Sequence, residues 1–122
     1  IFFILYYYFP SKKFITLLGT GKAKRELIFV DDLAEAIIFF LNMKTKEYLI
    51  NIGSGIEKSI EQYAKIIMKV LNVKMKIKFK YPKLDGTPRK LLETKIAKKY
   101  GWVSNTKLIN DIKTTYKDFL MS

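Results

Sequence analysis

Short apolar runs and stretches of alternating polarity mark three strands along the chain. The runs FITLL (14–18) and YLINI (48–52) each lead into a Gly-x-Gly turn, a pattern that predicts a short strand followed by a tight turn. From Lys74 to Tyr81, lysines alternate strictly with Met, Ile, Phe and Tyr. That period of two predicts a half-buried strand whose lysines face water.

A strongly apolar helix is predicted from Asp31 to about Asn42. The carboxylates of Asp31 and Asp32 can accept the free amide protons of its first turn and suit its positive end. Together with Glu35 they have the composition of a metal site, but helix capping explains them better. Leu33, Ala36, Ile37, Phe40 and Leu41 lie on one face of this helix, and Ile38 and Phe39 widen it. Because they cover most of the circumference, we expect the helix to be buried on most sides.

Three further helices follow. Ser59 begins one, with Gln62 at the spacing of a capping box. A short helix is expected over 94–100 with Gly101 as its carboxyl-terminal cap, and a last helix over 106–121. The apolar stripe of the last helix consists of Leu108, Ile109, Ile112, Tyr116, Phe119 and Leu120. The order strand, helix, strand, helix, strand, loop, helix, helix predicts an α/β fold.

The charge of the chain favours anionic partners. It has 23 basic and 11 acidic residues, a net charge of +12. An excess of Lys with Ile, Tyr, Phe and Asn is typical of AT-rich coding sequence, so Arg25 and Arg89, the only arginines, stand out. The lysines of 74–80 could follow a nucleic-acid backbone, yet the aromatic residues lie on the opposite side of that strand, which favours a solvated face.

Several classes of chemistry are excluded or disfavoured. The chain contains neither Cys nor His, which excludes disulfides, Cys/His zinc sites and imidazole catalysis. The segment IFFILYYYFP (1–10) is too short to span a membrane and lacks the flanks of a signal peptide. A buried strand, a broken helix or the end of a fragment would each explain it. We expect a cytoplasmic protein without a membrane partner.

The glycine pairs and one tyrosine–lysine pair resemble cofactor motifs only superficially. Neither 19–21 nor 53–55 has the spacing of a P-loop or of G-x-G-x-x-G, so both are interpreted as turns. Tyr8 and Lys12 have the Tyr-x-x-x-Lys spacing, which in a helix lets lysine lower the tyrosine pKa. Pro10 lies between them and would break that helix.

Two cationic positions are candidate anion sites. Arg25 follows the first glycine turn, where a guanidinium could bind a phosphate with paired hydrogen bonds or form a salt bridge with Glu26. Arg89 and Lys90 follow a turn that begins at Asp85. They could form a cationic binding loop or a solvated surface turn.

Four segments together resemble a known enzyme family. They are GTGKAKRELIFVDDLAEA (19–36), YLINIGSG (48–55), LDGTPRKLLET (84–94) and YGW (100–102). These segments are similar to the carboxyl-terminal part of the GDP-L-fucose synthases, which are extended short-chain dehydrogenase/reductases. Residues 25–34 and 50–55 match nucleotide-sugar epimerases and dehydratases widely, whereas 85–92 is more specific. The likeness implies two parts: an unmatched apolar segment, 1–13, and a nucleotide-sugar-binding portion, 14–122.

The resemblance implies an NADP(H)-dependent enzyme in its intact form. Such an enzyme epimerises and reduces GDP-4-keto-6-deoxy-D-mannose to GDP-L-fucose, and is expected to be a homodimer. Its glycine fingerprint and its Ser, Tyr and Lys catalytic residues have no counterpart here, so we expect no catalytic or cofactor-binding residue in this chain and no activity from it in isolation. In the family this portion completes the Rossmann domain and forms a small substrate subdomain. We therefore expect exposed apolar surface at Phe39, Phe40 and 48–52.

The same resemblance implies a set of substrate-binding residues. Arg25 matches an arginine that contacts the substrate diphosphate, and Asp85 matches an acidic residue of the pocket loop. Leu18 stands where the family usually has a substrate-contacting Trp, and Arg89 and Lys90 match the loop motif. Two alternatives stay open: a small basic nucleic-acid-binding module, without a GDP-sugar partner, and a fragment of another nucleotide-sugar epimerase or dehydratase.

Overall fold

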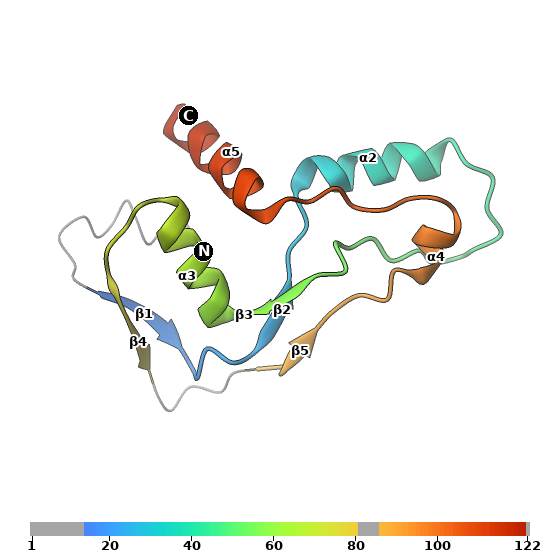
Figure 1. Cartoon of the computed structure of the whole chain (residues 1–122). Helices are drawn as coiled ribbons and strands as arrows, with labels where there is room; N and C mark the ends of the chain where they lie inside the picture. The colour runs from blue at the N-terminus through green and yellow to red at the C-terminus, as the bar shows by residue number, and fades with distance from the viewer. Residues whose placement is uncertain (1–13, 81–85, 122) are drawn as a thin grey trace.

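The computed structural model describes residues 14–80 and 86–121 (Figure 1). Over these residues the chain forms five strands and four helices around two small sheets. In chain order they are β1 (Phe14–Leu18), β2 (Lys24–Glu26), α2 (Val30–Leu41), β3 (Glu57–Ser59), α3 (Ile60–Val70), β4 (Lys76–Lys80), β5 (Arg89–Lys90), α4 (Lys95–Lys99) and α5 (Leu108–Met121). The predicted α/β class is confirmed.

The first sheet pairs β1 with β4 in parallel, through α3 as the crossover. Phe14 lies opposite Lys76 and Leu18 opposite Lys80. Both strands were predicted, and along β4 the burial alternates as expected, with its lysines exposed. Ile15 is buried on the inner face of β1. Hydrophobic alternation is a reliable predictor here because one face of the sheet is solvated and the other is covered.

The second sheet has the order β3-β2-β5 and was not predicted. β2 pairs with β3 antiparallel and with β5 in parallel. Beyond the strands, the amide of Lys24 donates to the carbonyl of Pro88 at 2.8 Å. Strands of two or three residues contain too few positions for a period of two to be recognised. The sheet nevertheless joins segments that are far apart in the sequence.

Helix α3 begins as predicted, at the capping box of Ser59 and Gln62. The Ser59 amide donates to Gln62 Oε1 at 2.8 Å, and the Gln62 amide donates to Ser59 Oγ at 3.1 Å. The amide of Glu61 donates to the carbonyl of Gly21 at 3.0 Å, which fixes the glycine turn against the start of the helix. Helix α5 packs beside α3. The short helix α4 ends at Lys99 with Tyr100 as its C-cap, and the φ of +91° of the next residue, Gly101, fits its predicted capping role.

The core around α2 is small, and the prediction that this helix is buried on most sides is wrong. Ala36, Ala97 and Trp102 are buried there, and partly buried residues pack against them: Ile28, Phe39, Phe40, Ile50 and Ile52. On the rest of α2, Ile37 is 53% and Leu41 is 78% exposed. The helix is apolar on most sides, as predicted, but within the described residues only one side of it packs against the rest of the fold.

The segment YLINI does not form the predicted strand. Residues 48–52 are irregular, and none of the described strands pairs with them. Tyr48 is fully exposed and Leu49 is 73% exposed, as expected for an apolar surface of this segment. Phe39 and Phe40, expected to be exposed as well, are instead partly buried against the core. None of the helices in the described ranges is long and apolar enough to cross a membrane.

Candidate functional site: a cationic three-stranded sheet

The β3-β2-β5 sheet brings together the two sequence motifs that carry the candidate cations. β2 lies in the segment that contains Arg25, and β5 is formed by Arg89 and Lys90. In the parallel register, Lys24 lies opposite Arg89 and Arg25 opposite Lys90. The predicted juxtaposition of the Arg25 segment with the loop that precedes β5 is therefore present in the fold.

Arg25 is held by backbone carbonyl groups. Its Nη1 donates to the carbonyl of Lys24 at 2.6 Å and to the carbonyl of Thr87, in the loop before β5, at 2.8 Å. A guanidinium has five N–H donors, so this arrangement leaves donors for a ligand. The alternative salt bridge with Glu26 is not formed, because the Glu26 carboxylate accepts from other groups.

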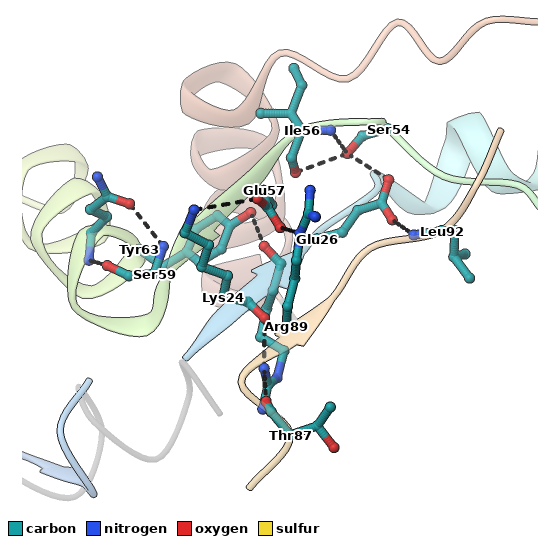
Figure 2. A network of polar contacts seen from close by, with 12 residues as sticks. Lys24, Glu26, Ser54, Ile56, Glu57, Ser59, Tyr63, Thr87, Arg89 and Leu92 are labelled. Carbon is teal, nitrogen blue, oxygen red and sulfur yellow. Dashed lines mark hydrogen bonds and ion pairs between the residues drawn. The ribbon is translucent and has the colours of Figure 1, made fainter. Parts of the chain in front are cut away.

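On the other face of β2, two cations converge on one carboxylate (Figure 2). Arg89 Nε donates to Glu57 Oε2 at 2.7 Å, and Lys24 Nζ lies 3.4 Å from Glu57 Oε1. The hydrogen bond from Arg89 is the main cause that lowers the pKa of Glu57 below 4.5, and the same contact raises the pKa of Arg89. Arg89 is thus already engaged with a protein carboxylate.

The register places three cations in one row across the sheet. Arg25 lies opposite Lys58 of β3 on one side and opposite Lys90 of β5 on the other. Residues directly opposite one another in a sheet share a face, so these three share the face that does not carry Glu57. Lys58 and Arg25 are half-buried and Lys90 is exposed. None of the three forms an ion pair with another described residue.

Glu26 connects the glycine turn at 53–55 to the second motif. Its Oε1 accepts from the amide of Gly55 at 2.5 Å, and its Oε2 accepts from the amide of Leu92 at 2.9 Å. Ser54 Oγ also reaches Oε1, at 3.4 Å (Figure 2). A Cβ at Gly53 would lie 2.5 Å from Glu26 Oε1, so a side chain there would displace the Glu26 carboxylate. The predicted turn is confirmed, and its role is to seat this carboxylate.

The Glu26 carboxylate also occupies a position that the pyrophosphate of a dinucleotide cofactor would need in this turn. Such a site needs unoccupied backbone amides at the start of a helix. Here the Gly55 amide already donates to the anionic Glu26, and β3 follows the turn. The turn at 19–21 leads into β2, and its Gly21 carbonyl accepts from the first turn of α3. Neither turn therefore fits a dinucleotide.

Tyr63 fixes β2 from the side of α3. The ring is buried, and its hydroxyl donates to the carbonyl of Arg25 at 3.0 Å. Burial is the main cause that raises the pKa of Tyr63 above 10.0. The phenol is consequently neutral and acts as a hydrogen-bond donor that positions the strand carrying Arg25.

Asp32 has a different role from the predicted one. The structure shows no side-chain cap at the start of α2; instead Asp32 Oδ2 accepts from Ser104 Oγ at 2.5 Å and from Thr106 Oγ1 at 2.6 Å. Burial acts to raise the pKa of Asp32, but these hydrogen bonds outweigh it and hold the pKa below 3.8. The carboxylate therefore anchors the segment between α4 and α5, while its place in the first turn of α2 was predicted correctly.

The other candidates are distributed differently. Leu18 ends β1, which belongs to the first sheet and not to the cationic one, and it is 57% exposed. Asp85, Tyr8 and Lys12 lie outside the described residues. Among the described residues, no cluster of three acidic side chains has the arrangement of a metal site. Lys58 was missed, because a single lysine in a three-residue strand carries no sequence signal.

An apolar cavity of about 220 Å³ lies apart from the cation row, between α3 and α5. Leu27, Ile67, Leu71, Leu108, Ile112 and Phe119 are among its lining residues. We interpret it as imperfect packing between the two helices rather than as part of the cationic site. It shares no lining residue with the row formed by Lys58, Arg25 and Lys90.

The fold resembles that of extended short-chain dehydrogenase/reductases over about a third of their length. The family model of the NAD dependent epimerase/dehydratase family matches residues 7–53. Together with the relatives described next, this match shows that the chain is similar to NAD-dependent epimerases and dehydratases. The resemblance seen in the sequence is thereby confirmed at the level of the family.

The relatives include GDP-sugar enzymes. A putative GDP-L-fucose synthase 2 of Arabidopsis thaliana is 33% identical over 106 residues, which cover 87% of this chain and 32% of the relative. Among solved structures, a GDP-6-OMe-4-keto-L-xylo-heptose reductase from C. jejuni aligns with a TM-score of 0.78 and 30% identity, covering 91% of this chain and 35% of that one. A GDP-mannoheptose C4 reductase from Campylobacter jejuni with NADP bound has a TM-score of 0.72 and 30% identity over 90% of this chain and 33% of that one. The chain thus spans about a third of the length of such relatives.

Proposed function

We propose that this chain is the GDP-sugar-binding portion of a GDP-L-fucose synthase-type epimerase/reductase. In this proposal Arg25 and Lys90 bind the substrate diphosphate, and Asp85, by its match to the family motif, contacts the substrate. The observation that carries the proposal is the 2.8 Å hydrogen bond from Arg25 Nη1 to the Thr87 carbonyl. That bond holds the arginine of one family motif against the loop of the other. Homology to GDP-sugar enzymes supports the choice of nucleotide.

The remaining candidates have weaker support as ligands. Arg89 is paired with Glu57, so in this proposal it positions the loop, and its predicted contact with substrate stays a prediction. Leu18 likewise stays a prediction, as a packing residue beside the sugar. NADP(H) would be the hydride donor of the intact enzyme, bound by residues outside the two glycine turns. We further propose that the chain in isolation binds substrate but does not convert it. An assay with NADPH and GDP-4-keto-6-deoxy-D-mannose tests this, and turnover above the blank would contradict it.

Calorimetric titration of the 122-residue chain with GDP-L-fucose and with UDP-glucose tests the proposal. We expect the GDP-sugar to bind. Arg25→Gln should lower its affinity at least about tenfold, because the variant loses the two charge-assisted hydrogen bonds proposed between the guanidinium and the diphosphate. Arg25→Lys keeps the charge but not the planar fork, and should recover only part of the affinity. Lys113→Gln, which removes an exposed lysine of α5, is the matched control. Equal binding of both nucleotide sugars, or an Arg25→Gln variant that binds normally, would contradict the proposal.

A further inference from the structure

We propose that Lys58 is a third diphosphate-binding residue, at the far end of the row that contains Arg25 and Lys90. This inference rests on the proposed function, because it assigns a further residue to the same ligand. Lys58 belongs to β3, which the sequence motifs shared with GDP-L-fucose synthases do not include. It enters the site through the antiparallel register that places it opposite Arg25.

The two faces of the sheet differ in their charge balance. On one face the cations Lys24 and Arg89 are compensated by Glu57, at 3.4 and 2.7 Å. On the opposite face Lys58, Arg25 and Lys90 have no acidic partner among the described residues. Uncompensated like charges side by side are unfavourable, and an anion that binds across them relieves their repulsion.

The dimensions of the row suit a ligand with two linked phosphates. Neighbouring strands lie about 4.8 Å apart, so three cations in register span about 10 Å. A single phosphate would satisfy only part of such a row. Lys58 and Arg25 are both half-buried, which restricts their screening by solvent relative to a fully exposed lysine. The central Arg25 supplies the fixed fork, and the two lysines supply mobile point charges on either side.

The experiment compares GDP with GMP as probes for the 122-residue chain. Lys58→Gln should weaken GDP binding roughly three- to tenfold and reduce the loss of affinity on raising salt, with a smaller effect on GMP. Lys58→Arg should bind GDP about as well as the wild type, because it keeps the positive charge. Lys58→Met, which keeps the aliphatic stem, separates loss of charge from loss of packing, and Lys113→Gln serves as the control. Circular dichroism verifies that each variant is folded.

The outcomes separate this inference from the proposed function. If Lys58→Gln and Lys58→Met bind GDP like the wild type while Arg25→Gln does not, the role of Lys58 is wrong and the proposed function stands. An equal loss for GDP and for GMP would show that Lys58 does not bind the second phosphate and would also overturn the inference. A wild-type chain that binds neither GDP nor GMP would overturn both.

Discussion

At the scale of single residues, two carboxylates, the buried Asp32 and the half-buried Glu26, act as anchors between distant segments. Asp32 of α2 accepts hydrogen bonds from Ser104 and Thr106, and Glu26 of β2 accepts from the amides of Gly55 and Leu92. In both cases an acidic side chain accepts hydrogen bonds from donors that lie in irregular segments, outside the strands and helices. The cost of burying the charge is offset by these hydrogen bonds.

The pH dependence of stability should report the anchor at Asp32. Its hydrogen bonds lower its pKa in the folded state below 3.8, so its stabilising contribution is present above that pH and is lost as the pH falls through the lowered pKa. Asp32→Asn should cost about 1–3 kcal/mol at pH 7, since one acceptor oxygen and the charge are lost. The difference between wild type and variant should shrink toward pH 3.

Thermal melts followed by circular dichroism, at pH 7 and at pH 3, measure this difference. Glu35→Gln is the matched control, because Glu35 is an exposed acidic residue of the same helix. It should leave the melting temperature nearly unchanged at both pH values. A cost of Asp32→Asn that stays constant between the two pH values would show that the charge of the carboxylate is not what stabilises the fold.

At the scale of elements, the sequence predicts those segments whose signals are local. β1, β4, the capping box of α3 and the glycine after α4 could be predicted because periodicity or a cap is contained in a few neighbouring residues. The sheet β3-β2-β5 could not, since its strands are two or three residues long and are defined by pairing across the chain. For the same reason the sequence identified Arg25, Arg89 and Lys90 as candidates but not Lys58.

YLINI shows the opposite error, in which a local signal lacks its tertiary partner. Its composition is that of a strand, yet a strand is stable only where a neighbouring strand forms hydrogen bonds with its N–H and C=O groups. None of the described strands lies beside it, and only its Ile50 and Ile52 pack on the core. A strand-like composition therefore does not establish a strand unless a pairing neighbour is present as well.

The turn at Gly21 connects the two sheets and should be sensitive to substitution. Gly21 has a φ of +72°, and a Cβ there would lie 2.6 Å from Phe79 Cε1. Gly21→Ala therefore combines backbone strain with displacement of a ring. Gly101 has a similarly positive φ of +91° but nothing within 4 Å of its Cβ position, so Gly101→Ala carries the strain without the clash.

We expect Gly101→Ala to cost about 1 kcal/mol and Gly21→Ala at least about 1 kcal/mol more. Denaturant unfolding of the two variants at neutral pH gives the comparison. Equal costs would show that Phe79 moves aside freely and that only the backbone conformation limits position 21. A Phe79→Leu background, which removes the ring, should bring Gly21→Ala close to Gly101→Ala.

At the scale of the whole molecule, apolar surface is exposed on α2 and on the segment that follows it. Ile37, Ile38 and Leu41 are 53%, 61% and 78% exposed, and Tyr48 and Leu49 are exposed beside them in the sequence. The chain spans about a third of the length of its relatives. We propose that this face packs against the portion of the relatives that the chain does not span. Left uncovered, such a patch promotes association.

The 122-residue chain should therefore self-associate through α2, and charge on that face should suppress the association. Ile37→Lys with Leu41→Lys should shift sedimentation velocity profiles toward the monomer and lower the binding of an apolar dye, because it interrupts the patch. GDP binding should be unchanged, since neither position belongs to the cationic sheet. Ile109→Lys is the matched control: Ile109 lies on α5 and is 53% exposed, as Ile37 is. If association persists in the α2 variant but disappears with Ile109→Lys, the chain associates through α5 instead of α2.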